Sequence, residues 1–144
     1  MLKPKHLIDS INNMRNLFVK FEIALKLKDI GFDEKCLMKW KAESDDRYEM
    51  CYDEDGYWNS ENASFVICSA PLYQQCIDWF RNKHNLIIEI QTDQTSNPKF
   101  CYEIYKYKEY GNWTRLTDVN NWGLTYDYYR NINDAIEETI KLIN

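Results

Sequence analysis

A chain of 144 residues has the length of one ordinary globular domain, and its apolar fraction of 44% is enough to build a core. No run approaches the roughly 20 apolar residues that cross a bilayer, and four Gly with three Pro exclude linker-like and collagen-like chains. The net charge is −5, and 15% of the residues are aromatic, with 11 Tyr among them. This composition predicts a soluble domain that does not cross a membrane and that is unusually rich in aromatic residues.

The negative charge is concentrated in one segment. Residues 43–62 hold eight acidic side chains against one Arg, a net charge of −7, so the remaining residues carry +2. Proteins that bind nucleic-acid backbones need clustered cations, and a chain this acidic lacks them. We therefore expect a protein partner and no nucleic acid. The acidic segment either meets a basic partner or solvates a hairpin.

Cysteine and histidine usage indicates the compartment. The five cysteines are odd in number and widely spaced without a C-x-x-C pair, which is unlike a secreted disulfide scaffold. Two histidines leave little from which to build a zinc site. We predict reduced, mostly buried cysteines, no metal site and no cofactor. The first six residues lack the apolar region of a signal peptide, which favours the cytoplasm.

The start of the chain separates into an arm and a domain. Residues 1–16 are interpreted as an N-terminal extension, and residues 17–144 as a single α+β domain. Apolar side chains recur with helical spacing over residues 19–30, with a narrow polar stripe opposite. Gly31 supplies a left-handed stop, after which Phe32 can fold back onto the last turn.

Short strands are expected next. Three of them are predicted in this half, at residues 36–40, 48–52 and 65–68. The first two flank an acidic turn at residues 42–46. The sequence Asp-Glu-Asp-Gly at residues 53–56 predicts a second turn, because Asp-Gly accepts the positive φ values of tight hairpins.

The second half alternates helices and strands. Ser69 or Ala70 is expected to cap an amphipathic helix that carries Pro71 in its first turn and runs to about His84. A hairpin follows, with strands at residues 86–91 and 100–107 around a polar loop at 92–98, a neighbour at 112–117 and an edge strand at 126–129. The last helix is expected to start at Asn131, with Asp134 in its first turn.

Helices separated by runs of strands predict an α+β fold rather than a doubly wound sheet. In this fold an antiparallel sheet of short strands and hairpins packs against about three amphipathic helices. Within the hairpin, Leu86, Ile88 and Ile90 are expected to alternate inward. On the second strand one face is expected to carry Phe100, Tyr102 and Ile104 and the other Cys101, Glu103 and Tyr105.

The sequence carries no catalytic signature. The glycine-rich phosphate loops, the G-x-S-x-G elbow and the H-E-x-x-H zinc motif are all missing. His84, at the end of a predicted helix, is expected to interact with the helix dipole rather than act as a base. The acidic pairs fall on predicted turns, where a solvated surface is typical. We predict no catalytic residues.

Tyr and Trp are typical anchors of interaction surfaces, although Tyr also suits half-buried strand positions. They accompany the acidic segment and the second sheet region. The candidate binding residues lie in the acidic aromatic segment and on the polar face of the second helix: Tyr48, Tyr52, Asp53, Glu54, Asp55, Tyr57, Trp58, Gln74, Gln75, Asp78 and Arg81.

Two blocks carry a resemblance to a known family. They are Phe18-Val19-x-Phe21-Glu22-Ile23-Ala24-Leu25-x-Leu27-Lys28-x-x-Gly31-Phe32-Asp33-Glu34-x-Cys36 and Cys68-Ser69-Ala70-Pro71-Leu72-Tyr73-Gln74-Gln75 with Asp78-Trp79-Phe80-Arg81. Over about residues 18–143 the chain resembles small uncharacterised proteins of bacteriophages and prophages of gut bacteria. The resemblance implies a phage-derived protein in the bacterial cytoplasm, and it implies no catalytic residues.

Three functional hypotheses follow. The first is a small non-enzymatic binding protein that acts on a host or phage macromolecule. The second is an acidic inhibitor that presents carboxylates to a basic protein as a nucleic-acid backbone presents phosphates. The third is a small enzyme or nucleotide-binding protein whose pocket is not visible from sequence. The oligomeric state does not follow from the sequence.

Overall fold

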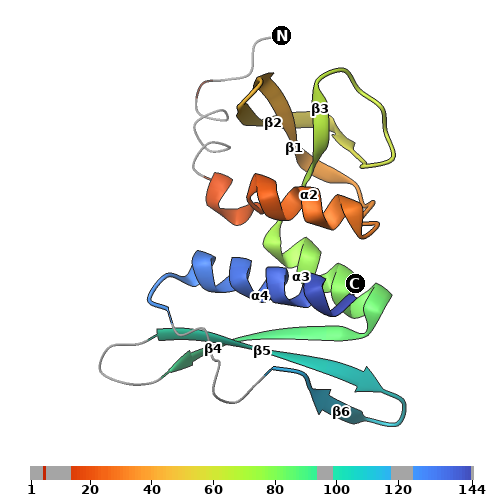
Figure 1. Ribbon diagram of the computed structural model, residues 1–144, viewed down its shortest axis with the longest axis vertical. Coiled ribbons are helices and arrows are strands. Elements are labelled where there is room, and N and C mark those ends of the chain that lie inside the picture. Colours follow the sequence, from red (N-terminus) through yellow and green to blue (C-terminus); the bar gives the residue numbers. More distant parts are fainter. Residues whose placement is uncertain (1–4, 6–13, 94–98, 118–124, 144) are drawn as a thin grey trace. The chain divides into compact units, whose positions relative to one another are not determined.

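The computed structural model describes residues 5, 14–93, 99–117 and 125–143 (Figure 1). The chain divides into two compact units, residues 1–73 and 74–144, and each unit contains a three-stranded antiparallel sheet. The predicted α+β fold is confirmed, with three α-helices and two sheets in the described residues. The single domain expected over residues 17–144 stays a prediction, and most of the expected extension lies outside the described residues.

The first unit is built around a sheet of order β2-β1-β3. Its elements are a 3-10 turn η1 (Arg15–Leu17), α2 (Phe21–Asp29), β1 (Cys36–Ser44), β2 (Arg47–Tyr57) and β3 (Val66–Ala70). The core on the inner face of this sheet contains Phe18, Met38, Met50 and Ala70. Helix α2 packs against β3 and buries Ile23, Ala24 and Leu27.

Helix α2 ends where its sequence predicts. Gly31 adopts φ +94°, and the amide of Phe32 donates to the carbonyl of Leu27 at 2.9 Å. The Phe32 ring is buried. A residue with a side chain would be strained at this φ, so the glycine stop and the returning aromatic ring are both confirmed.

The hairpin of β1 and β2 is longer than predicted, and its turn is the pair Asp45–Asp46. The second turn expected at residues 53–56 is wrong, because β2 continues to Tyr57. Met38 pairs with Tyr52 and Cys36 with Tyr57, so residues 53–56 of β2 oppose the single residue Leu37 of β1 and form a bulge. Gly56 does adopt the positive φ that Asp-Gly indicates, at +79°, but inside the bulge.

The helix cap expected at Ser69 or Ala70 is also wrong. Both residues end β3, where they pair with Lys39 and Met38 of β1. The amide of Ser69 donates to the side-chain oxygen of Asn59 at 2.8 Å. Sheet pairing and this side-chain contact therefore hold the segment extended up to Pro71.

The second unit is built around a sheet of order β4-β5-β6. Its elements are α3 (Tyr73–His84), β4 (Leu86–Asp93), β5 (Lys99–Lys108), β6 (Asn112–Arg115) and α4 (Tyr128–Ile143). Helix α4 packs on β4 and β5 with Ile132, Ile136 and Ile140 buried. Leu86 and Ile88 are buried and Glu89 is exposed, so the predicted alternation along β4 is confirmed. Most of the loop expected at 92–98 lies outside the described residues.

Helix α4 begins earlier than predicted, and residues 126–129 form no edge strand. Oδ1 of Asp127 accepts hydrogen bonds from the amides of Tyr129 at 2.9 Å and Arg130 at 3.2 Å. These bonds satisfy two of the four amides that a helix start leaves without an intrahelical partner. Asp127 therefore caps the helix, and Asn131 lies inside it. No helix among the described residues is long and apolar enough to span a membrane.

We predict that Asp127→Ala lowers the free energy of unfolding by about 1 kcal/mol, because two helix amides lose their acceptor. Urea denaturation measures this change. Asp134→Ala, at an exposed position of the same helix, is the matched control and should change the free energy by less than about 0.5 kcal/mol. A larger loss for Asp134→Ala would place the helix start at Asn131 instead.

Candidate functional site

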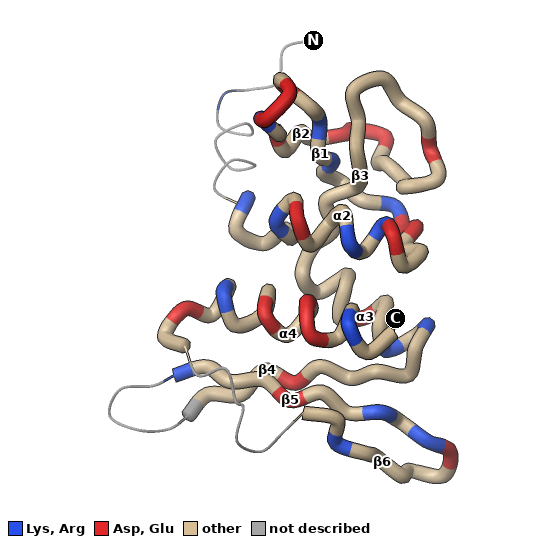
Figure 2. Tube along the Cα trace, viewed as in Figure 1, with Lys and Arg blue, Asp and Glu red and all other residues tan. Residues whose placement is uncertain are grey.

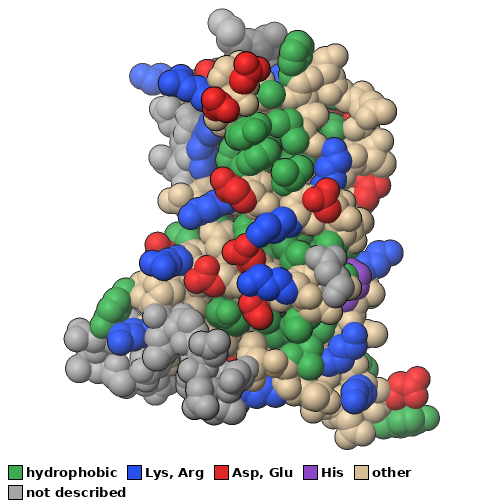
Figure 3. Space-filling model, in the orientation of Figure 1, with side chains coloured by type: hydrophobic (Ala, Val, Ile, Leu, Met, Phe, Trp, Pro, Cys, Tyr) green, Lys and Arg blue, Asp and Glu red, His purple; other side chains and the backbone are tan. Residues whose placement is uncertain are grey.

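The aromatic part of the acidic segment begins at Tyr48 of β2. Its ring stacks on Phe21 of α2 with centroids 3.8 Å apart, and Phe21 meets Trp40 edge-on at 5.8 Å. Tyr48 remains 42% exposed. In Figure 3, hydrophobic side chains gather over β1 and β2 beside α2, with charged side chains around them. The stacking gives Tyr48 a defined orientation at the surface.

The acidic residues cluster along the same hairpin and the loop that follows it (Figure 2). Asp53 forms an ion pair with Lys39 at 2.8 Å, and its other oxygen accepts from the amide of Asp55 at 3.1 Å. The hydrogen bond from Lys39 lowers the pKa of Asp53 from its ordinary value. The other seven acidic side chains of residues 43–62 form no ion pair within the described part of the chain. Their charge is therefore available to a partner.

Tyr57 and Trp58 separate in the structure. Tyr57 is 1% exposed, and its hydroxyl donates to the carbonyl of Glu61 at 2.8 Å. The expectation that Tyr57 contacts a partner is corrected, because its ring belongs to the core. Trp58 is 37% exposed, and the ammonium of Lys35 lies 5.3 Å from the centre of its ring. Tyr52 and Glu54 are also exposed.

The candidate residues of the second helix lie on α3, in the second unit. Gln74 donates to Oδ1 of Asp78 at 3.1 Å, and Arg81 forms an ion pair with the same oxygen at 2.7 Å. Gln75 is half-buried. The structure thus joins Gln74, Asp78 and Arg81 in one contact group. The acidic aromatic residues belong to the first unit instead.

A further surface lies on the second sheet, on the face turned away from α4, and we refer to it as the outer face. Strand alternation assigns to it the side chains of Ile87, Glu89, Gln91, Cys101, Glu103, Tyr105, Tyr107, Trp113 and Arg115. A single helix covers only one side of a sheet, so polar residues are expected on the other. Glu103 is polar as expected, but it is buried, with only 6% of its surface exposed.

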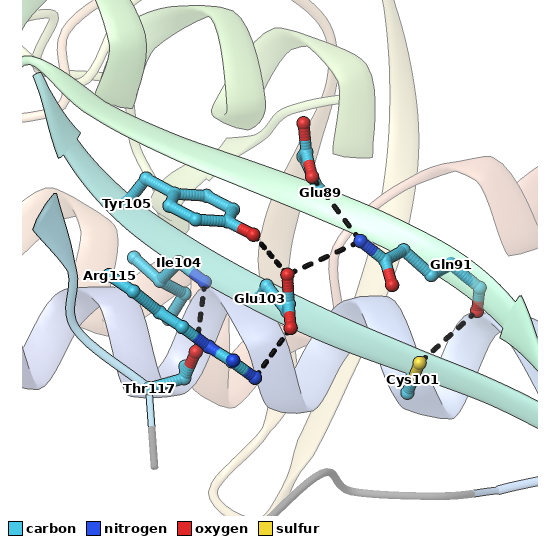
Figure 4. A network of polar contacts seen from close by, with 8 residues as sticks. All are labelled: Glu89, Gln91, Cys101, Glu103, Ile104, Tyr105, Arg115 and Thr117. Atoms are coloured by element: carbon cyan, nitrogen blue, oxygen red, sulfur yellow. Dashed lines mark hydrogen bonds and ion pairs between the residues drawn. The ribbon is translucent and has the colours of Figure 1, made fainter. Parts of the chain in front are cut away.

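Glu103 lies at the centre of a hydrogen-bond network that joins all three strands (Figure 4). Arg115 of β6 forms an ion pair with its Oε1 at 2.5 Å. The Tyr105 hydroxyl donates to Oε2 of Glu103, and the side-chain amide of Gln91 donates to the same oxygen at 3.3 Å. Each carboxylate oxygen therefore has a partner, as a buried charge requires. The bond to Glu103 also raises the pKa of Tyr105 to about 12.

Two adjoining hollows open on this face. One of about 290 Å³ is lined by Ile87, Glu89, Tyr105 and Trp113. The other, of about 340 Å³, shares Ile87 and Trp113 and adds Arg81, Asn85 and Tyr107. The Tyr107 and Trp113 rings lie 4.7 Å apart, and Trp113 is 51% exposed. The outer face thus combines exposed rings with a carboxylate.

The sequence interpretation missed this site, although it placed Cys101, Glu103 and Tyr105 on one face of a strand. That alternation was the available signal. It does not reveal that Glu103 is buried, nor that Arg115 pairs with it from a strand twelve residues away. The register of β5 against β6 brings these two side chains together, and local composition does not specify the register.

Histidine and cysteine chemistry is mostly structural. The His84 ring packs edge-on against Trp79 at 4.7 Å, and burial together with Lys106 and Lys83 lowers its pKa. A favourable interaction of charged His84 with the helix dipole would raise that pKa, so the expected dipole role is not supported. All five cysteines are thiols, and four are buried, as predicted. The described residues contain no group of three or more potential ligands placed to hold a metal ion.

Comparison of the chain with protein-family models, curated proteins and solved structures found no match. The candidate surfaces are therefore interpreted from their own chemistry.

We predict that Asp53→Asn lowers the free energy of unfolding at pH 7 by about 1 kcal/mol or less, because the Lys39 pair is partly solvated. The pKa of Asp53 is lowered in the fold, so its contribution is present above pH 3.8 and is lost as the pH falls through the folded value. Urea denaturation from pH 7 to pH 2.5 should show the two proteins converging. Asp55→Asn, at an exposed neighbour, is the control, and an equal loss there would contradict the role of the ion pair.

We predict that Tyr105 ionises near pH 12 and that Glu103→Gln returns its pKa towards the ordinary 10.0, because the charged acceptor is removed. A raised phenol pKa stabilises the fold below pH 10, and this contribution is lost as the pH rises through 12. The ring-carbon NMR shift of Tyr105, assigned with Tyr105→Phe, measures the ionisation. An unchanged pKa in a folded Glu103→Gln variant would show that another group raises it.

Proposed function

We propose that this chain is a small non-enzymatic binding protein of bacteriophage origin that captures a host or phage protein in the bacterial cytoplasm. One observation supports the proposal most directly. Tyr48 presents a half-exposed ring, fixed by Phe21, on a hairpin whose neighbouring carboxylates have no cationic partner in the described chain. The phage origin rests on the sequence resemblance alone.

The aromatic component favours a protein partner. Rings of Tyr and Trp supply much of the energy at protein interfaces, since they bury a large area and lose few rotatable bonds. Phe21 already restricts the Tyr48 ring, and Lys35 lies over the Trp58 ring. Side chains ordered before binding lose less conformational entropy on complex formation. Tyr48 and Trp58 are accordingly the best contact candidates of the first unit.

The acidic side chains of residues 43–62 indicate the charge of the partner surface that would surround these aromatic contacts. Carboxylates at a rim accelerate association with an oppositely charged partner and discourage acidic ones. Seven carboxylates in residues 43–62 form no ion pair with the described residues, and they suit a partner with a basic rim. The same carboxylates favour the second hypothesis, an acidic inhibitor that mimics nucleic acid. In that case charge rather than the rings would dominate the affinity.

The third hypothesis, an enzyme or nucleotide-binding protein, receives less support. Ligand pockets usually occupy roughly 300–1,000 Å³. Of the two hollows of the second unit, the one of about 290 Å³ lies just below that range and the one of about 340 Å³ at its lower end. A thermal-shift screen with nucleotides and metal ions tests this class, and a shift of several degrees would favour it over a binding protein.

The deciding experiment is affinity capture from lysogenic bacterial cells, with the captured protein then purified and its affinity measured. We predict that Tyr48→Ala and Trp58→Ala each weaken binding by about 1–2 kcal/mol, or 5- to 30-fold, as expected for interface rings. Tyr110→Ala, at a ring that is 92% exposed on the second unit, is the matched control and should leave the affinity unchanged.

Charge variants separate the two binding hypotheses. Glu54→Gln with Asp55→Asn removes two exposed charges and keeps the Asp53–Lys39 pair. An interface anchored by rings should lose little affinity in this double variant. Collapse of binding with strong salt dependence, while Tyr48→Ala binds normally, would favour the acidic inhibitor and contradict the proposed contact surface.

A further inference from the structure

We infer that the hollow bounded by Glu89, Tyr105 and Trp113 binds the guanidinium group of an arginine that a protein partner presents. The inference rests on the proposed function in one respect, namely that the ligand is part of a captured protein. It concerns the second unit, whereas the proposed contacts of Tyr48 and Trp58 lie in the first.

The lining has the chemistry that such a cation requires. Tyr105 and Trp113 supply rings, Ile87 supplies an apolar contact, and Glu89 supplies a carboxylate. Aromatic rings attract cations through their quadrupoles, and Trp does so most strongly. A planar guanidinium stacks on such rings and also donates two parallel hydrogen bonds to a carboxylate, which an ammonium does not.

Among the described residues, the charges of the outer face leave Glu89 without a cationic partner. Glu103 is compensated by Arg115, and Arg81 at the neighbouring hollow is compensated by Asp78 at 2.7 Å. Glu89 is exposed and accepts only a long hydrogen bond of 3.4 Å from Gln91 among its described contacts. The face described here therefore carries one uncompensated negative charge, located in the wall of the hollow. An incoming cation would neutralise it.

The Glu103 network holds the aromatic wall in place. The Tyr105 hydroxyl is tied to the buried Glu103, which Arg115 fixes in turn from β6. On the other side, Trp113 lies 4.7 Å from the Tyr107 ring. A wall ordered in advance loses little entropy when a ligand enters. The buried ion pair therefore has a positioning role. This role accounts for its presence better than stability does, because a buried ion pair contributes little net stability.

The size of the hollow favours one side chain over a larger ligand. At about 290 Å³ it falls just below the range of roughly 300–1,000 Å³ that is usual for drug-sized molecules. The second hollow, beyond Trp113, offers space for the flanking chain of a peptide. Glu89 in the lining would also repel the phosphates of a nucleotide, so an arginine carried by a protein fits the site better.

The test is an NMR titration of the full chain with Nα-acetyl-arginine amide, observed at the Trp113 indole N–H and assigned with Trp113→Phe. We expect a saturable shift. Nα-acetyl-citrulline amide, which has the same shape without the charge, should give none, and Nα-acetyl-lysine amide should bind more weakly. Glu89→Gln should weaken the arginine probe by about fivefold, the effect of one partly exposed charge.

Glu109→Gln is the matched control, because Glu109 is an equally acidic, exposed residue in the turn between β5 and β6 and does not line the hollow. It should leave the probe affinity unchanged. Equal binding of the citrulline compound, or an unaltered affinity in Glu89→Gln, would overturn the cation site.

The partner's role is tested separately from the site. If Glu89→Gln loses the probe but captures the partner protein with unchanged affinity, the assignment to a partner's arginine is wrong and the proposed function stands. If the chain binds the probe but captures no protein, the proposed function fails, and the ligand is a free guanidinium compound instead.

Discussion

In the described residues each sheet has three strands, with α2 packed against the first sheet and α4 against the second, and this constraint determines where apolar and polar side chains lie. A helix covers one face, so the strands must alternate between core and solvent residues. Met38 and Met50 accordingly lie in the core while Lys39 is directed outward, and in the second unit Ile88 is buried next to the exposed Glu89. In the second unit the alternation also directs Tyr105 and Trp113 away from the α4 side, so the surface proposed for binding there follows from the same pattern that builds the core.

Each sheet carries an ion pair that joins neighbouring strands, but the two pairs have different consequences. Lys39 and Asp53 are each 18% exposed, and their pair braces the bulge of β2 against β1. The side chain of Glu103 is 8% exposed against 29% for that of Arg115, so more of the Glu103 hydration is lost on folding. Partly solvated pairs contribute about 0–1 kcal/mol. A buried pair must first offset its desolvation, and its value here lies in fixing the Tyr105 hydroxyl, and with it the ring that lines the hollow.

Strong periodicity made part of this fold predictable. The hairpin of β4 and β5, the stop of α2 at Gly31 and the amphipathic helices all follow from local patterns. The errors occurred where one local signal fits two structures. Asp-Gly at residues 55–56 suits a bulge as well as a turn, since both need a positive φ. Serine is a common helix cap, but Ser69 is held in a strand by its pairing with β1 and by its hydrogen bond to Asn59. Tyr57 and Trp58 are adjacent aromatic residues that the sequence does not distinguish, and only their burial in the fold separates a core residue from an exposed one. The Glu103 site depends on the register between strands, which no local pattern contains.

The aromatic residues that give this sequence its character therefore fall into two physical groups. Phe32, Tyr57 and Phe80 are buried and stabilise the cores. Tyr48 and Trp113 are half-exposed, and each is held by another ring, Phe21 in one unit and Tyr107 in the other. Both also lie near carboxylates without a cationic partner in the described chain. A ring that is ordered before binding and bordered by unneutralised negative charge discriminates in favour of basic partners at small entropic cost. Because the two units share this chemistry, the proposed function places the action of the acidic charge at these two sites rather than over the whole surface.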